Sequence, residues 1–269
     1  MLELLGLPVS ASEHAWQIDR VLILIHIVVI AAFVTWGAFF IIPLVRYRKR
    51  VHPKADYQGL RTRVPYYGVA ALALAEVVLL LGFSLPFWEG EVRAMPTPSA
   101  SEVQIQITAE QFKWHIHYPG SDGIFGRTDA ALVNTQTNPL GIDSEDPNSS
   151  DDITTQNQLY LPVNRQVIIE LRSRDVIHSL NLPQFRIKQD AIPGMAIPVH
   201  FIPTMTTAEF RETTGDATRN FEIACAQLCG ANHYYMRGTV VVGTDGEYTA
   251  WYEEQLEAKR AAQVDADWF

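Results

Sequence analysis

The chain has 269 residues, a net charge of −9 at pH 7 and a mean hydropathy near zero. The acidic balance argues against a nucleic-acid-binding protein, because such proteins present basic surfaces to phosphates. The near-zero mean hydropathy conceals two long apolar stretches in the first third of the chain, which argues against a wholly soluble protein.

These two apolar stretches predict a transmembrane hairpin. Residues 21–45 carry no charged side chain, and residues 64–88 carry one, Glu76. A helix rises about 1.5 Å per residue, so each stretch is long enough to cross a bilayer core of about 30 Å. A signal peptide is the alternative for 21–45, but this stretch is too long and has neither a preceding basic region nor a following small-residue cleavage site.

The connection between the two stretches indicates the orientation. Residues 46–63 contain 7 of the 21 basic residues, whereas residues 1–20 contain only Arg20. Basic connections stay on the cytoplasmic side. We therefore expect a cytoplasmic loop at 46–63, an outer N-terminal segment at 1–20 and a large outer domain at 89–269.

The outer domain reads as an all-β fold. Short segments rich in β-branched or aromatic residues are bounded by turn residues, which is typical of a β-sandwich or barrel. The expected strands are 101–107, 114–118, 165–173, 197–203, 207–213, 219–225 and 237–243. Residues 119–157 are dense in Gly, Pro, Asn, Asp and Ser and predict a long surface loop, and residues 246–264 predict a C-terminal helix.

The outer domain is strongly acidic. Residues 89–269 contain 25 acidic and 13 basic side chains, which gives a net charge of −12. Such a surface favours a basic soluble partner, attracted in a salt-sensitive way. The alternative is that the acidic residues simply keep the domain soluble.

One short loop holds the only two cysteines, Cys225 and Cys229, followed by His233 and Met236. A disulfide is one interpretation, because the domain lies outside the cytosol. Zinc is a second, although zinc does not favour Met and its thiolate pairs are usually spaced more tightly. Copper is the third, because thiolate, imidazole and thioether together form the soft ligand set of copper electron-transfer sites.

Two thiolates four residues apart can bridge two copper ions, so that one odd electron is shared between them. Each copper then needs an imidazole and a weak ligand. His233 and Met236 provide one of each, and His178, at the end of an expected strand, is the candidate for the second imidazole. An early ligand His and a late Cys-His-Met loop follow the cupredoxin order.

At this point the sequence resembles subunit II of haem-copper cytochrome c oxidase, over nearly its whole length. The resemblance rests on the two-helix anchor, "DVIHSLNLP" (175–183), "QDAIPGM" (189–195) and "CAQLCGANHYYM" (225–236). It implies a cupredoxin-like Greek-key barrel that binds two copper ions. The implied ligands are His178, Cys225, the backbone carbonyl of Gln227, Cys229, His233 and Met236.

The resemblance also implies a function. The copper centre would accept electrons from a cytochrome c or a cytochrome c domain and pass them to the haems of subunit I, where oxygen is reduced to water and protons are pumped. The chain has no C-x-x-C-H motif, so we expect no haem in it. Its partners would be subunit I, other oxidase subunits and membrane lipid, in a bacterial plasma membrane rather than a mitochondrial inner membrane.

Four other classes share part of this pattern. Nitrous oxide reductase has a similar copper domain, but the membrane hairpin argues against it. Quinol oxidase subunit II lacks the copper ligands, and a single-copper shuttle needs only one Cys. A membrane-anchored copper-delivery or thiol-redox protein also uses Cys, His and Met, but delivery sites are usually Met-rich, and this chain has five Met.

The chain departs from the family pattern where the electron is received. The family places two Trp around a Tyr above the copper site, and here the stretch reads Phe112, Lys113 and Trp114. Phe112 offers a contact surface without an indole N–H. Lys113 places a cation where a basic cytochrome c would dock. We expect a different donor, such as a cytochrome c domain within a larger respiratory assembly; the alternative is that only contact details differ.

Two further positions also depart. Glu76 lies near the middle of an apolar helix, where a carboxylate either serves protons or forms a neutral hydrogen bond to subunit I. The family usually has Glu at the position of Gln227, with its carboxylate on a magnesium ion at the subunit I junction. Gln keeps the oxygen but loses the charge, so we expect magnesium binding to be weakened or replaced by hydrogen bonds.

Overall fold

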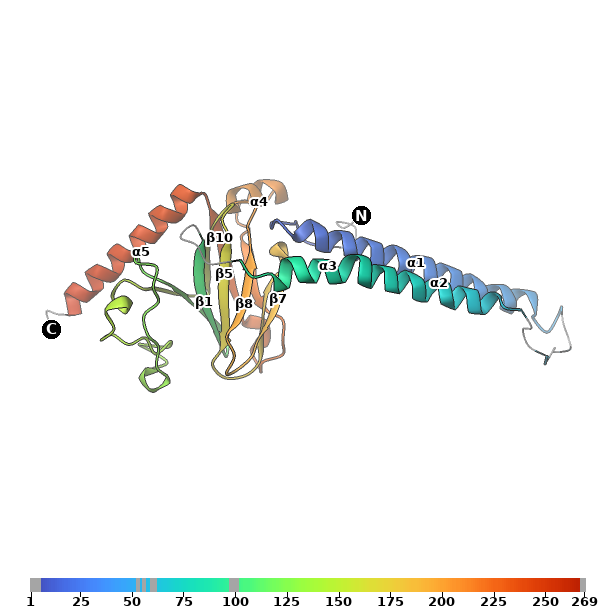
Figure 1. Cartoon of the computed structure of the whole chain (residues 1–269), viewed down its shortest axis with the longest axis horizontal. Coiled ribbons are helices and arrows are strands. Elements are labelled where there is room, and N and C mark those ends of the chain that lie inside the picture. Colours follow the sequence, from blue (N-terminus) through green and yellow to red (C-terminus); the bar gives the residue numbers. More distant parts are fainter. Residues whose placement is uncertain (1–5, 52–53, 55–56, 59–61, 97–101, 267–269) are drawn as a thin grey trace. The chain divides into compact units, whose positions relative to one another are not determined.

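The computed structural model describes residues 6–51, 54, 57–58, 62–96 and 102–266. They form two compact units, a helical unit within residues 16–94 and a β domain built from residues 7–15 and 95–266 (Figure 1). Parts of the predicted segments 1–20 and 46–63, and the first residue of the expected strand 101–107, lie outside the described residues.

The helical unit contains two helices long and apolar enough to cross a membrane. The first is α1 (Ala15–Arg46), and the second runs from Val64 to Arg93. The second helix consists of α2 (Val64–Leu79), a π-helical turn (Leu80–Ser84), α3 (Leu85–Phe87) and a second π-helical turn (Trp88–Arg93). Both helices leave their apolar side chains exposed, as expected of surfaces that meet lipid or a membrane partner.

The β domain consists of two five-stranded sheets. The strand order is β3-β2-β1-β5-β8 in one and β4-β10-β9-β6-β7 in the other. The pairs β1–β5 and β4–β10 are parallel, and the remaining neighbours are antiparallel. The strands are β1 (Val103–Glu110), β2 (Lys113–Tyr118), β3 (Ile153–Gln156), β4 (Gln158–Pro162), β5 (Val167–Ser173), β6 (His178–Leu182), β7 (Ile187–Ala191), β8 (Ile197–Phe201), β9 (Phe221–Cys225) and β10 (Arg237–Gly243).

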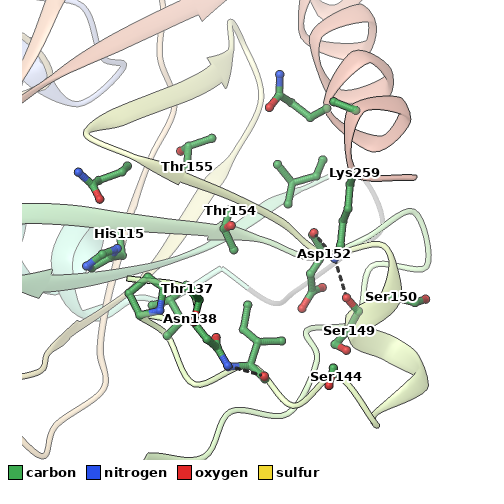
Figure 2. A pocket seen from close by; sticks show the side chains of 17 residues that line it. His115, Thr137, Asn138, Ser144, Ser149, Ser150, Asp152, Thr154, Thr155 and Lys259 are labelled. Atoms are coloured by element: carbon green, nitrogen blue, oxygen red, sulfur yellow. Dashed lines mark hydrogen bonds between the residues drawn. The ribbon is translucent and has the colours of Figure 1, made fainter. Parts of the chain in front are cut away.

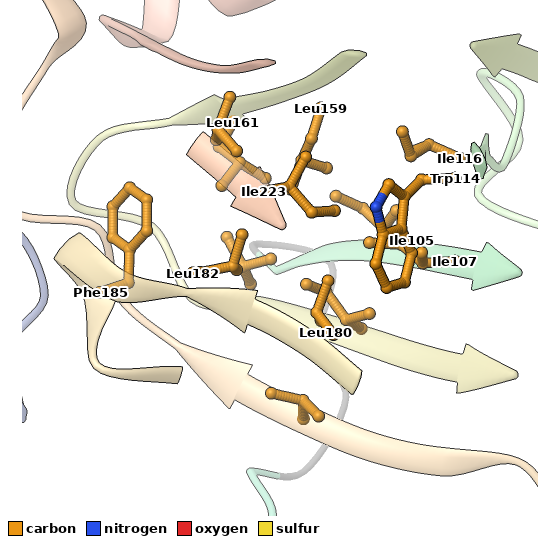
Figure 3. Close-up of a cluster of buried hydrophobic side chains, with 14 of the residues drawn as sticks. Ile105, Ile107, Trp114, Ile116, Leu159, Leu161, Leu180, Leu182, Phe185 and Ile223 are labelled. Carbon is orange, nitrogen blue, oxygen red and sulfur yellow. The ribbon is translucent and has the colours of Figure 1, made fainter. Parts of the chain in front are cut away.

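The core lies between the two sheets. Strand β1 alternates strictly between buried and half-buried residues, so its inward side chains, such as Ile105 and Ile107, come from every second position. Leu180 and Ile223 face them from the other sheet (Figure 3). Each such side chain contributes about 1.5–3 kcal/mol when fully buried. The predicted architecture of two apolar helices, a β-sandwich and a C-terminal helix is confirmed.

One predicted strand is wrong. Residues 207–213 form helix α4 (Thr207–Thr214), because Thr206 and Glu209 make a capping box in which each side chain accepts a hydrogen bond from the other's backbone N–H. Gly215 ends the helix with a left-handed φ of 69°. The β-branched and aromatic residues that suggest a strand also fit a helical face, with Thr207 and Phe210 buried three positions apart.

The sequence prediction missed strands β3, β4, β6 and β7. Residues 119–157, expected to be a surface loop, contain two 3₁₀ turns (Ala130–Leu132 and Pro147–Ser150) and end in β3. This segment covers the outer face of β2: His117 Nε2 lies 2.7 Å from Asp152 Oδ2, and both side chains are buried. The outer face of β2 is therefore buried.

The C-terminal helix α5 (Asp245–Ala266) packs on the same segment. Lys259 Nζ donates to the backbone carbonyls of Ser149 and Asp152, both at 2.7 Å. A cavity of about 580 Å³ lies between α5, β3 and residues 137–156 (Figure 2). None of the predicted copper ligands lines this cavity.

The segment before α1 belongs to the β domain. Ala11 N donates to Gln184 O at 2.8 Å, and Ser12 Oγ donates to Phe185 O at 2.7 Å. Thr204 N in turn donates to Ala11 O at 2.9 Å. The residues that precede the helical unit in sequence therefore belong to the same domain as those that follow it.

Candidate metal centre

Strand pairing brings the predicted ligands to one end of the second sheet. His178 is the first residue of β6, and Cys225 is the last residue of β9, which lies between β6 and β10. Leu180 pairs with Cys225 in the β6–β9 register. The loop after Cys225 ends in a 3₁₀ turn (His233–Tyr235), and Met236 directly precedes β10.

The donor atoms of these residues converge. The sulfur atoms of Cys225 and Cys229 lie 3.8 Å apart. His178 Nδ1 is 3.8 Å from the Cys225 sulfur, and His233 Nδ1 is 3.6 Å from the Cys229 sulfur. The Met236 sulfur lies 3.8 Å from Cys229, so each Cys has its own imidazole and Cys229 also has the thioether.

The backbone carbonyl of Gln227 completes the set. Cys225 Sγ donates to this oxygen at 3.2 Å. Gln227 as a whole is exposed to solvent, but its carbonyl oxygen faces the Cys225 sulfur. The Gln227 carbonyl thus lies on the side of Cys225.

Burial and hydrogen bonds make the two thiols unequal. Burial raises the pKa of Cys225, but hydrogen bonds with His178 and with the Ser179 and Gln227 backbones outweigh burial and lower this pKa to about 6. Burial and the neighbouring Cys225 raise the pKa of Cys229 to about 12. Of the two thiols, Cys225 is therefore the more acidic.

His178 is fully buried, and its ring is held by two partners. Burial lowers the pKa of His178, but hydrogen bonds to Cys225 and Asp175 outweigh burial and the net shift is upward. A bound metal would replace the proton on the nitrogen that faces Cys225.

The donor set fits copper. Both cysteines are free, and their 3.8 Å separation leaves room for shared coordination rather than a disulfide, whose sulfurs lie about 2.05 Å apart. Two thiolates, two imidazoles, a buried thioether and a carbonyl are soft-to-borderline ligands that suit copper better than zinc, since zinc does not favour Met. The ligand atoms of His178, Cys225 and Cys229 all lie within 4.8 Å of one another.

The residues expected to receive the electron lie beside this cluster in different environments. Phe112 is half-buried, and a Cβ built on Gly230 would lie 3.0 Å from its ring. Phe112 therefore rests against residues 225–236, the loop that holds the two cysteines, which we call the copper loop. Trp114 is completely buried, with its ring centroid 6.4 Å from that of His178. Lys113 is paired with Glu110, with 3.7 Å between Nζ and the carboxylate, so part of its charge is already neutralised.

Glu76 lies on α2, in the helical unit. It lines a cavity of about 420 Å³ between the two apolar helices, with Ile25, Val29 and Ala32 on the side of α1. Ser84 lines the same cavity.

The sequence prediction missed two residues that contact the centre. Asp175 Oδ1 accepts a hydrogen bond from His178 Nε2 at 2.7 Å. Gln111, in the turn between β1 and β2, donates from Nε2 to the carbonyl of Cys229. The Asp-x-x-His spacing could have indicated the first, because these residues lie close in sequence, but nothing local to Gln111 indicates the second.

Comparison with known proteins places this arrangement in a family. Residues 103–243 match the sequence profile of the periplasmic domain of cytochrome c oxidase subunit II. The alternative cytochrome c oxidase subunit 2 of Bradyrhizobium diazoefficiens is 34% identical over 180 residues, which are 66% of this chain and 59% of that protein. Cytochrome c oxidase subunit 2 of Thermostichus vulcanus is 26% identical over 281 residues, which cover 96% of this chain and 80% of that protein.

A solved structure is also similar. The periplasmic domain of cytochrome oxidase subunit II from Bradyrhizobium japonicum aligns with a TM-score of 0.40 and 26% identity, covering 61% of this chain and 99% of that domain. The family profile spans more than half of the chain and includes every predicted copper ligand. The chain therefore belongs to the cytochrome c oxidase subunit II family.

Proposed function

We propose that this chain is the electron-accepting subunit of a respiratory haem-copper oxidase in a bacterial plasma membrane. It would take electrons from a cytochrome c or a cytochrome c domain and deliver them to the haems of subunit I, for reduction of oxygen to water coupled to proton translocation. The observation that carries the proposal is the convergence of Cys225, Cys229, His178, His233 and Met236 at one end of the β domain.

Two copper ions bound here would supply a one-electron carrier in which the odd electron is shared through the two thiolates. The chain's part is to keep the ligand positions constant. His178 and Met236 are fully buried, and His178 begins a strand paired on both sides. A rigid, largely dry set of ligands reorganises little when the charge changes, which favours fast electron transfer.

The surface around the copper loop supports docking of a partner. Leu228, Tyr234 and Tyr235 expose 78%, 63% and 68% of their areas. Large apolar side chains exposed together on a soluble domain mark an interaction surface. The surrounding domain carries a net charge of −12, which favours a basic donor or donor domain.

The pairing of Lys113 with Glu110 bears on the identity of the donor. A free cation at this point would repel a basic cytochrome c, but Glu110 also accepts hydrogen bonds from His115 at 2.7 Å and pairs with Arg174 at 3.2 Å. Lys113 and Arg174 share the one carboxylate of Glu110, so the charge of Lys113 does not stand alone. We retain a donor domain held in a larger respiratory assembly as the proposed donor, on the strength of Phe112 rather than of Lys113.

A copper-delivery protein is the second candidate, because it would hold the same ligand types. Delivery requires ligands that a partner can reach. Met236 is fully buried and Cys229 is 5% exposed, so two of the sulfur ligands are shielded from exchange. This burial favours a resident electron-transfer centre.

The function is tested in the purified oxidase complex. Cys225→Ser and Cys229→Ser should each abolish donor-driven oxygen consumption, whereas Met236→Leu should retain part of it because the thioether is only a weak ligand. Reduction of the haems by a small artificial reductant serves as the control for an intact subunit I. Unimpaired donor-driven turnover in both Cys variants would overturn the proposal.

A further inference from the structure

The carboxylate of Asp175 makes three hydrogen bonds beside the copper cluster. Its Oδ1 accepts from His178 Nε2 and from Val176 N, each at 2.7 Å. Its Oδ2 accepts from Gln111 N at 2.8 Å. The His178 side chain is fully buried and that of Asp175 is 27% exposed, so the His178–Asp175 contact is only partly screened by water.

The contact with His178 fixes what this imidazole can do. A neutral His carries one proton and one free lone pair, and the hydrogen bond of one nitrogen decides which nitrogen is available to a metal. Asp175 accepts a hydrogen bond from Nε2–H, so the lone pair is on Nδ1, the atom that faces the Cys225 sulfur at 3.8 Å. The carboxylate thereby orients the ring and makes it a more basic ligand.

The contact with Gln111 connects Asp175 to the loop that holds Cys225 and Cys229. The Gln111 backbone N–H binds Asp175, and its side-chain amide binds the carbonyl of Cys229. The turn between β1 and β2 therefore joins the segment before β6 to the cysteine loop. Phe112, the next residue, rests on the same loop at Gly230.

The two imidazoles differ in this respect. Among the described residues, no carboxylate hydrogen-bonds His233, whose recorded contact is with the Cys229 sulfur at 3.6 Å. Loss of the Asp175 carboxylate should thus act mainly on the copper that His178 would bind.

We infer that Asp175 is a positioning residue of the copper centre: it holds His178 in its metal-binding tautomer and, through Gln111, sets the spacing between His178 and the cysteine loop. This inference rests on the proposed copper function. Removal of the charge weakens the electron donation of His178 and removes a nearby negative charge, and both effects stabilise the reduced state. The reduction potential should therefore rise when the carboxylate is lost.

The test uses the full chain, loaded with copper and purified in its oxidase complex. Asp175→Asn keeps the size and an acceptor for His178 but presents N–H groups to Gln111 N. It should retain two coppers, raise the reduction potential and make the electron distribution between the coppers less even, seen as altered hyperfine splitting in the electron paramagnetic resonance spectrum. Asp175→Ala should lower copper affinity about 10–100-fold, as loss of a carboxylate behind a ligand His does elsewhere.

Asp190→Asn is the matched control. Asp190 is exposed on β7, pairs in register with Ser179 next to His178, and carries the same charge. If Asp175 acted only through its charge, Asp175→Asn and Asp190→Asn would shift the reduction potential equally and would leave the hyperfine splitting unchanged. That result would overturn the inference. If Asp175→Ala fails to fold, the comparison of the two Asn variants still decides. Failure of the proposed function is seen separately, as a wild-type chain without a two-copper spectrum.

Discussion

The indole ring of Trp114 lies edge-on to the imidazole of His178, with 6.4 Å between their centroids and 62° between their planes. Both residues are completely buried. Trp114 comes from the first sheet and His178 from the second, so the core of the sandwich continues directly into the candidate copper centre. Trp114 therefore cannot contact a donor protein directly. An electron from a donor would reach Trp114 only through residues that lie nearer the surface.

Trp114→Ala should destabilise the β domain strongly. Removing a fully buried Trp costs about 3–5 kcal/mol, because the packed ring is lost and a cavity remains. Urea unfolding of the full chain, followed by the loss of β-sheet circular dichroism, measures this change. Tyr235→Ala is the control, because Tyr235 is 68% exposed and its removal should change stability by less than about 0.5 kcal/mol. Equal, small effects for both variants would show that Trp114 is not part of the core.

Phe112→Ala should slow electron transfer from the donor and leave the copper spectrum unchanged. Phe112 is half-buried and lies against Gly230, which is not one of the predicted ligands. Stopped-flow reduction of the loaded centre by the physiological donor gives the rate. Phe112→Trp, which restores an indole, should match or exceed the wild-type rate. Unchanged rates in the Ala variant would place the electron's path elsewhere.

The sequence predicts the local parts of this structure better than the distant ones. The copper loop has its ligands within twelve residues, so their spacing alone indicates the site. The bond from Gln111 to Cys229 joins residues 118 positions apart, and no local pattern encodes it. Residues 207–213 have the β-branched and aromatic content of a short strand, but the capping box of Thr206 and Glu209 makes them a helix.

The outer face of β2 gives a second example. His115 and His117 alternate as on an exposed face, but residues 119–157 fold back over them and bury both. The covering contact, His117 to Asp152, joins residues 35 positions apart and depends on the path of a segment without regular periodicity. Composition identified that segment as irregular, but composition does not indicate which face an irregular segment covers.

Glu76→Gln should lower proton-coupled turnover of the assembled oxidase. A carboxylate near the middle of a membrane helix makes insertion of the helix less favourable by about 2.5–3.5 kcal/mol. Such a residue therefore usually faces protein or water, and it often takes part in proton transfer. Oxygen consumption and proton release by the complex in vesicles are the measurements. Ser84→Ala, which changes another residue of the same cavity, is the control. Full turnover and full pumping in Glu76→Gln would leave Glu76 as a neutral hydrogen-bond partner only.

Gln227→Glu should strengthen magnesium binding by the complex without altering the copper spectrum. The Gln227 carbonyl, not its side chain, faces the Cys225 sulfur, so a new carboxylate leaves the ligand set unchanged. Magnesium prefers charged oxygen ligands, and the wild-type amide lacks the charge. Magnesium is counted in the purified complex after chelator washing. Retention of one magnesium per wild-type complex would contradict the expectation that the amide weakens this site.

The most direct test of the account is the copper content and the electron paramagnetic resonance spectrum of the oxidised wild-type chain in its complex. Two bridging thiolates, Cys225 and Cys229, with one imidazole on each side, predict two coppers per chain and one odd electron shared between both copper nuclei. Cys225→Ser should remove that shared electron. One copper per chain with the electron on a single nucleus, or a zinc-loaded chain with no signal, would contradict the assignment of this family member as an electron-accepting copper subunit.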